Sequence, residues 1–120
     1  MNGGHVASLE AKEQQAIKAL IARLRERFSG RILQTILFGS KARGDDQAES
    51  DIDILLVVNE EDWPLRQEIS TLAARVSLEH DVLLDPRVIG RERWERMKQR
   101  RFGLYQNIAA EGIPLTPAST

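Results

Sequence analysis

The chain has no cysteine among its 120 residues. This absence excludes disulfides and thiolate metal sites, and it suits a reducing compartment. No apolar run approaches the ~20 residues of a membrane-spanning helix, and the first residues lack the basic and apolar parts of a secretory leader. We therefore expect a soluble cytoplasmic protein that does not engage a membrane.

Aromatic residues and net charge are also scarce. Phe, Trp and Tyr make up 5% of the chain, too few for a series of stacking platforms along single-stranded nucleic acid. The formal net charge is only −1, but the charges are segregated: residues 45–62 carry eight acids and no base, and residues 91–101 carry six bases and two acids. The basic segment could attract RNA or an acidic partner, or form a solvated helix face.

The length and the 42% share of apolar residues favour one globular domain over residues 1–120, with loose ends at 1–7 and 114–120. Helical and extended patterns alternate along it. We expect a helix that Ser8 caps and Gly30 ends, strands at about 31–38 and 51–58, a helix at about 62–79, a third strand interrupted or ended near Pro86, and one basic helix at about 91–110. This order favours an α/β (α+β) sandwich in which helices cover a small mixed sheet.

A glycine-serine turn follows the first expected strand. Gly39 leaves no side chain in the way of a ligand, and Ser40 offers a hydroxyl and backbone N–H groups. The guanidinium of Arg43 suits phosphate oxygens, and Lys41 could also steer a triphosphate. The turn by itself is equally explained as an ordinary turn that ends a strand without binding a ligand. Arg43 could instead pair with an acid nearby.

Two aspartates begin the second expected strand. Asp51 and Asp53 are two residues apart, so an extended backbone points both carboxylates to one face. Mg²⁺ is a hard cation that binds carboxylates together with substrate phosphates, and two such ions can clamp a phosphoryl displacement. An isolated pair of this kind is usually a solvated strand end, but here it follows a phosphate-binding turn.

Together, Gly39-Ser40-Lys41-Ala42-Arg43-Gly44 and Ser50-Asp51-Ile52-Asp53 resemble the signature of the DNA polymerase beta-like nucleotidyltransferase superfamily. The chain is similar in particular to minimal nucleotidyltransferase domains, the antitoxin-type partners of HEPN toxins. The resemblance implies a nucleotidyltransferase fold and ATP as substrate. It further implies nucleotide binding by Gly39, Ser40, Arg43 and Ser50, and catalysis by Asp51 and Asp53 with two Mg²⁺ ions.

The resemblance also implies a third acid on the next strand, which would complete the metal site and help activate the acceptor hydroxyl. Asp81 is the favoured residue, because it precedes the apolar residues of the third expected strand. Asp85 would share its face by the period of two and remains an alternative, although a turn before Pro86 explains it equally well.

The resemblance implies Mg²⁺-dependent transfer of a nucleoside monophosphate, AMP from ATP, to a hydroxyl of a macromolecular acceptor. The expected acceptor is a HEPN-type toxin, within a homo- or hetero-oligomer and without nucleic acid. Two alternatives stay open: a non-catalytic antitoxin that acts by contact alone, and nucleotide transfer to RNA.

Overall fold

The computed structural model describes residues 9–44 and 51–115 of the chain. Four strands form one sheet in the order β3-β2-β1-β4. They are β1 (Ile32–Phe38), β2 (Ile52–Val58), β3 (Leu84–Gly90) and β4 (Ile113–Pro114). β1 is antiparallel to β2 and β4, whereas β2 and β3 are parallel. The predicted small mixed sheet is confirmed.

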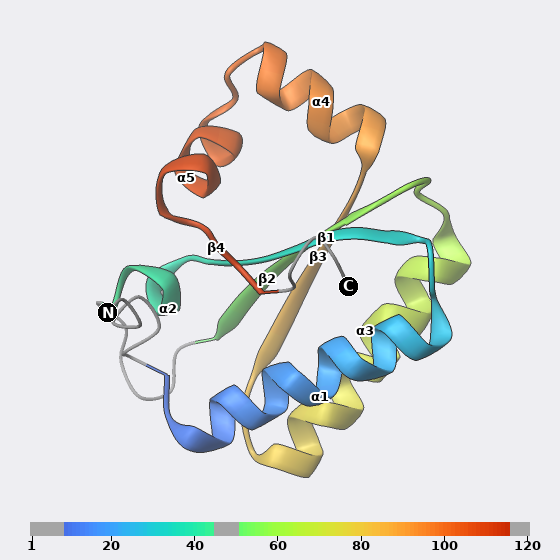
Figure 1. Ribbon diagram of the computed structural model, residues 1–120, viewed down its shortest axis with the longest axis vertical. Helices are drawn as coiled ribbons and strands as arrows, with labels where there is room; N and C mark the ends of the chain where they lie inside the picture. The colour runs from blue at the N-terminus through green and yellow to red at the C-terminus, as the bar shows by residue number, and fades with distance from the viewer. Residues whose placement is uncertain (1–8, 45–50, 116–120) are drawn as a thin grey trace.

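Helices cover both faces of this sheet. α1 (Ala11–Arg27) and α3 (Trp63–His80) lie on one side, and α4 (Arg91–Gln99) and α5 (Gly103–Glu111) lie on the other (Figure 1). The short α2 (Ser40–Arg43) follows β1 directly. β2 sends Ile54 and Leu56 into the core beneath α1 and α3, and Leu55 and Val57 into the core beneath α4 and α5. Burial on both faces explains why β2 reads as an unbroken apolar run.

α1 begins later than the sequence suggested. Its N-cap is Glu10, whose backbone N–H donates to the Glu13 carboxylate at 2.9 Å, and Ser8 lies outside the described residues. The prediction that Ser8 caps this helix is therefore wrong. Satisfaction of the Glu10 N–H by an acid three residues later is half of a capping box.

β3 is continuous through Pro86, so the prediction of an interruption there is wrong. β3 is the outer strand of the sheet, and a proline is tolerated where its missing N–H would have faced outward. The strand also starts later than expected, at Leu84, whose N–H donates to the Ser77 hydroxyl of α3 at 3.1 Å.

The single basic helix expected at 91–110 is two helices. The chain turns at Arg101, which has a positive φ of 55°, and resumes as α5 at Gly103. Trp94 of α4 and Ile108 of α5 are both buried in the core cluster on the same face of the sheet. The rings of Trp94 and Tyr105 meet edge to face at 5.0 Å and join the two helices.

The end of the described chain is less loose than expected. Ile113 and Pro114 pair with Leu37 and Ile36 of β1 as the short strand β4. Leu115 then donates its N–H to the Thr35 carbonyl at 2.9 Å. Within residues 9–44 and 51–115, no helix is both long and apolar enough to cross a membrane.

Candidate active site

Three strand ends meet at one end of the sheet. Because β1 is antiparallel to β2 and β3, its C-terminal end adjoins their N-terminal ends. Phe38, the last residue of β1, is opposite Asp53, and Asp53 is opposite Asp85 of β3. The sheet register thus gathers the glycine-serine turn and two aspartates from three different strands.

Gly39 lies directly against the Asp53 carboxylate. Its φ is +76°, and a Cβ placed on it would come 2.2 Å from Asp53 Oδ2. A side chain at this position would displace the Asp53 carboxylate, and the positive φ favours glycine for a second, independent reason. The turn and the acid are therefore in direct contact, and a phosphate that followed the turn would reach the carboxylate.

Asp53 is the acid whose protonation is most affected. Partial burial, followed by the negative charge and hydrogen bonding of Asp85, raises the pKa of Asp53 from 3.8 to about 6. Asp51 adds a smaller contribution of the same sign, and the Arg87 guanidinium opposes the rise. Two adjacent carboxylates that repel each other in this way form a site that a cation would stabilise.

The structure does not place Asp81 where the third acid was expected. Asp81 is not at the head of β3: it is the C-cap of α3, with a positive φ of 57°. Its side chain is 95% exposed and pairs with Lys12 of α1 at 3.2 Å. Asp85, the alternative candidate for the third acid, is the residue opposite Asp53 in the sheet.

The cations of the turn have protein partners. Lys41 is buried, 1% exposed, and its Nζ is 2.7 Å from Glu13 Oε2 of α1, so Lys41 is not available to steer a triphosphate at the surface. Arg43 is half-exposed and pairs with Glu111 at the end of α5, at 3.5 Å. Ser40 opens α2 and is partly accessible.

The Lys41–Glu13 pair anchors the turn to α1. Glu13 is not among the functional residues predicted from the sequence. Glu13 lies three and four residues before Ala16 and Ile17, which places it on the apolar stripe of the helix. An acid on such a stripe is a signal for a buried partner, because a carboxylate is rarely buried unpaired. The predicted nucleotide-binding residue Ser50 lies outside the described residues.

The residues present are compatible with magnesium. In the described part of the chain, no three carboxylate or imidazole groups stand close enough together to hold a metal ion unaided. Mg²⁺, however, commonly binds one or two carboxylates and takes its remaining ligands from substrate phosphates and water. The juxtaposed Asp53 and Asp85, whose repulsion raises the pKa of Asp53, fit that requirement.

Comparison with known proteins agrees with this geometry. The family model described as "Nucleotidyltransferase domain" matches residues 17–113. In Methanocaldococcus jannaschii, "Putative protein adenylyltransferase MJ0604" is 35% identical over 100 residues, covering 83% of this chain and 94% of its own length. "Putative protein adenylyltransferase MJ0141" of the same organism is 46% identical over 56 residues, covering 44% of this chain and 54% of its own.

A solved structure shares the fold. It is a crystal structure of a mutant of the toxin-antitoxin pair MntA-HpeT, with a TM-score of 0.55 and 24% identity. The match covers 82% of this chain and 70% of the other chain. The predicted nucleotidyltransferase-like fold is confirmed.

Proposed function

The chain belongs to the nucleotidyltransferase domain family, and from that premise we propose that it transfers AMP from ATP to a hydroxyl of a partner protein. The observation that carries the proposal is the contact of Gly39 with Asp53, with Asp85 opposite Asp53 on the next strand. This arrangement joins a turn that admits phosphate to a pair of acids. The similarity to proteins named as adenylyltransferases of proteins supports the choice of acceptor.

In the proposed reaction, the acceptor oxygen forms a bond to the α-phosphorus of ATP. The bond from that phosphorus to the oxygen bridging to the β-phosphate breaks, and pyrophosphate leaves with the electron pair. The proton of the acceptor hydroxyl passes to the Asp53–Asp85 pair.

Each residue of the turn has a defined part in this proposal. Gly39 lets the phosphates approach Asp53, Ser40 offers its hydroxyl and backbone N–H to phosphate oxygens, and Arg43 adds positive charge beside them. Ser50 stays a predicted nucleotide-binding residue. Two Mg²⁺ ions, held by Asp51, Asp53 and Asp85 together with the phosphates, would neutralise the charge that develops during transfer.

We assign the acceptor to a toxin. The solved relative is a toxin-antitoxin pair, which supports a toxin as the partner of this chain as well. The sequence signature favours a toxin of the HEPN type, and modification of its hydroxyl would be the means of neutralising it. The two chains would then form a hetero-oligomer.

The experiment uses ATP labelled on the α-phosphate. The pure protein is incubated with labelled ATP and Mg²⁺ in an extract of its own host, beside an Asp53→Asn variant, and the products are resolved before and after protease or ribonuclease treatment. We expect a protease-sensitive labelled band that the variant does not produce. A ribonuclease-sensitive band would move the function to RNA, and the absence of label in an extract shown to contain the partner would favour a binding module.

A further inference from the structure

A groove runs along the outer edge of the sheet, beside the acids. It has a volume of about 650 Å³ and lies between α3 on one side and the junction of α4 and α5 on the other. Its floor is the second half of β3, from Pro86 to Ile89. Phe102 and Leu104 line it from the helix junction, and both are unusually exposed for their type, at 48% and 38%.

The backbone of this edge offers few outward groups to a partner strand. The Ile52 N–H donates to the Leu83 carbonyl, and in a parallel ladder this directs the polar groups of alternate β3 residues toward β2. The groups of Leu84, Pro86 and Val88 therefore face outward. The Leu84 N–H is taken by Ser77 and Pro86 has none, so Val88 offers the outward N–H donor of the groove.

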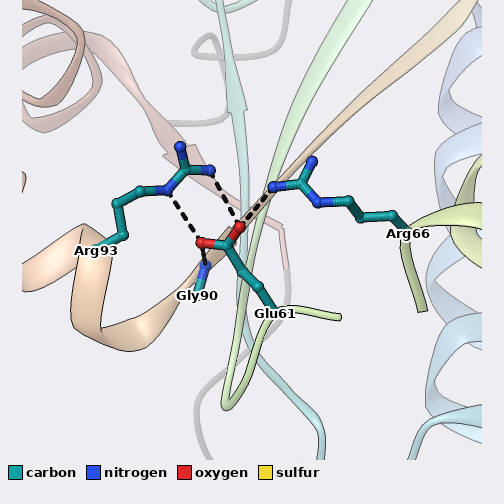
Figure 2. Close-up of polar contacts among 4 residues, drawn as sticks. All are labelled: Glu61, Arg66, Gly90 and Arg93. Atoms are coloured by element: carbon teal, nitrogen blue, oxygen red, sulfur yellow. Dashed lines mark hydrogen bonds and ion pairs between the residues drawn. The ribbon is translucent and has the colours of Figure 1, made fainter. Parts of the chain in front are cut away.

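The charge of the groove has one sign. Three arginines line it, Arg66, Arg87 and Arg93, and none of the other described residues that line it is an acid. Glu61 lies between two of them. Its carboxylate accepts from Arg66, from Arg93 at 3.0 Å and from the Gly90 N–H at 2.8 Å (Figure 2). One carboxylate shared by two guanidiniums fixes their positions and leaves a surplus of positive charge and of N–H donors.

The groove is continuous with the proposed active site. Arg87 is two residues after Asp85 on β3, so the two side chains share a face, and their charged groups are 3.5 Å apart. The Arg87 charge also acts on Asp53. A strand advances about 3.3 Å per residue, so a segment lying along Pro86–Ile89 would bring a neighbouring residue of its own chain to the acids.

We propose that this groove binds an extended acidic segment of the acceptor protein, as an added strand along β3, and so delivers the acceptor hydroxyl to Asp53 and Asp85. The inference rests on the proposed function. Main-chain pairing with Val88 sets the register, Phe102 and Leu104 contact apolar side chains of the segment, and the three arginines select for acids. The outward Val88 N–H at the sheet edge favours a peptide over RNA, because an extended peptide can pair its main chain with a strand edge.

Binding is measured on the whole ¹⁵N-labelled protein without nucleotide, by NMR titration. The probe is a short synthetic peptide in which Glu and Asp alternate with Val and Tyr. We expect its addition to shift the amide signals of Val88, Gly103 and Leu104. The same peptide with lysine in place of each acid should bind at least tenfold more weakly. Equal binding of the two peptides, no shift at these amides, or tighter binding of oligouridine would overturn the proposal.

Variants test the same surface. Phe102→Ser/Leu104→Ser removes exposed apolar contacts, and Ser70→Trp fills the groove from an exposed position on α3. Both should weaken peptide binding at least fivefold, whereas Leu78→Ser, which changes an 85% exposed residue outside the groove, should not. Unchanged binding in both groove variants would refute the proposal.

The labelled-ATP assay separates this proposal from the function on which it rests. We expect the groove variants to raise the acceptor concentration needed for half-maximal labelling at least fivefold, with the ATP requirement unchanged. If wild type and the groove variants reach half-maximal labelling at the same acceptor concentration, the groove proposal is rejected and the proposed function stands. Peptide binding without any labelling would reject the function and keep the groove.

Discussion

Gly39 and Asp53 are in direct contact: a Cβ on Gly39 would lie 2.2 Å from Asp53 Oδ2. The contact joins the end of β1 to the start of β2, since Phe38 and Asp53 are paired in the sheet. A side chain at Gly39 would therefore shift the Asp53 carboxylate, in addition to straining the backbone of the turn. The two halves of the sequence signature are therefore a single structural unit.

Gly39→Ala should abolish labelled-AMP transfer, because the new methyl group displaces the Asp53 carboxylate. Gly30→Ala is the matched control, since Gly30 has a similar φ of +83° but nothing within 4 Å of the added Cβ. Both variants should lose about 1 kcal/mol or more of unfolding free energy through backbone strain. Transfer rates and urea unfolding of the two variants check this, and equal activity of both would show that the contact is unimportant.

Asp53→Asn should stabilise the metal-free protein at pH 8. The folded-state pKa of Asp53, about 6, is above its ordinary value of 3.8, so ionisation costs the folded state stability as the pH rises through that interval. We expect a gain of about 1 kcal/mol at pH 8, reduced by solvent screening at this partly exposed site, and none below pH 4.

Urea unfolding in EDTA at the two pH values measures this difference. Added Mg²⁺ and ATP should reverse it by stabilising the wild type alone. A variant that is no more stable than wild type at pH 8 would argue against repulsion between Asp53 and Asp85.

Lys41→Met should lower the unfolding free energy by about 3 kcal/mol, because it leaves the Glu13 carboxylate buried without the ammonium. The double variant Lys41→Met/Glu13→Gln should recover most of the loss. Lys12→Met, which removes the exposed pair with Asp81, is the control and should cost less than about 1 kcal/mol. Thermal and urea unfolding of wild type, Lys41→Met, Glu13→Gln and the double variant complete the cycle, and additive losses at positions 41 and 13 would contradict the buried pair.

Glu61→Gln should destabilise the fold by about 1–2 kcal/mol at pH 7, since an amide weakens the contacts with Arg66 and Arg93. Burial opposes ionisation of Glu61, but the Gly90 N–H and the two guanidiniums hold its pKa below 4.5. The stability that the carboxylate contributes is therefore present above pH 4.5 and is lost as the pH falls through the lowered pKa. Unfolding at pH 7 and pH 3 should show a gap between the two proteins that closes in acid; a constant gap would point to packing instead.

Much of the fold could be predicted from local patterns. The apolar runs gave β1 and β2, and Asp62 with Pro64 marked the start of α3, where the Asp62 carboxylate accepts from the Leu65 N–H at 2.7 Å. Trp94 is buried in the core, whereas Trp63, at the start of α3, is 69% exposed. The sequence pattern around Trp63 does not reveal whether a side chain in the first turn of α3 faces the sheet or the solvent.

The errors arise from tertiary contacts. Pro86 was read as a strand breaker because its position at the sheet edge depends on strand order. An expected break at Pro86 puts the start of β3 earlier in the sequence than Leu84, and this favours Asp81 over Asp85 as the third acid. The break between α4 and α5 falls at Arg101, whose positive φ of 55° turns the chain before Gly103. Periodicity alone is satisfied by one long helix.

The most direct test of the active-site account compares Asp85→Asn with Asp81→Asn in the labelled-AMP transfer assay. Asp85 is opposite Asp53 in the sheet, whereas the side chain of Asp81, the C-cap of α3, is 95% exposed and pairs with Lys12. We expect Asp85→Asn to lower the transfer rate at least 100-fold and Asp81→Asn to leave it within about twofold of wild type. Loss of transfer in Asp81→Asn with activity retained in Asp85→Asn would contradict the account.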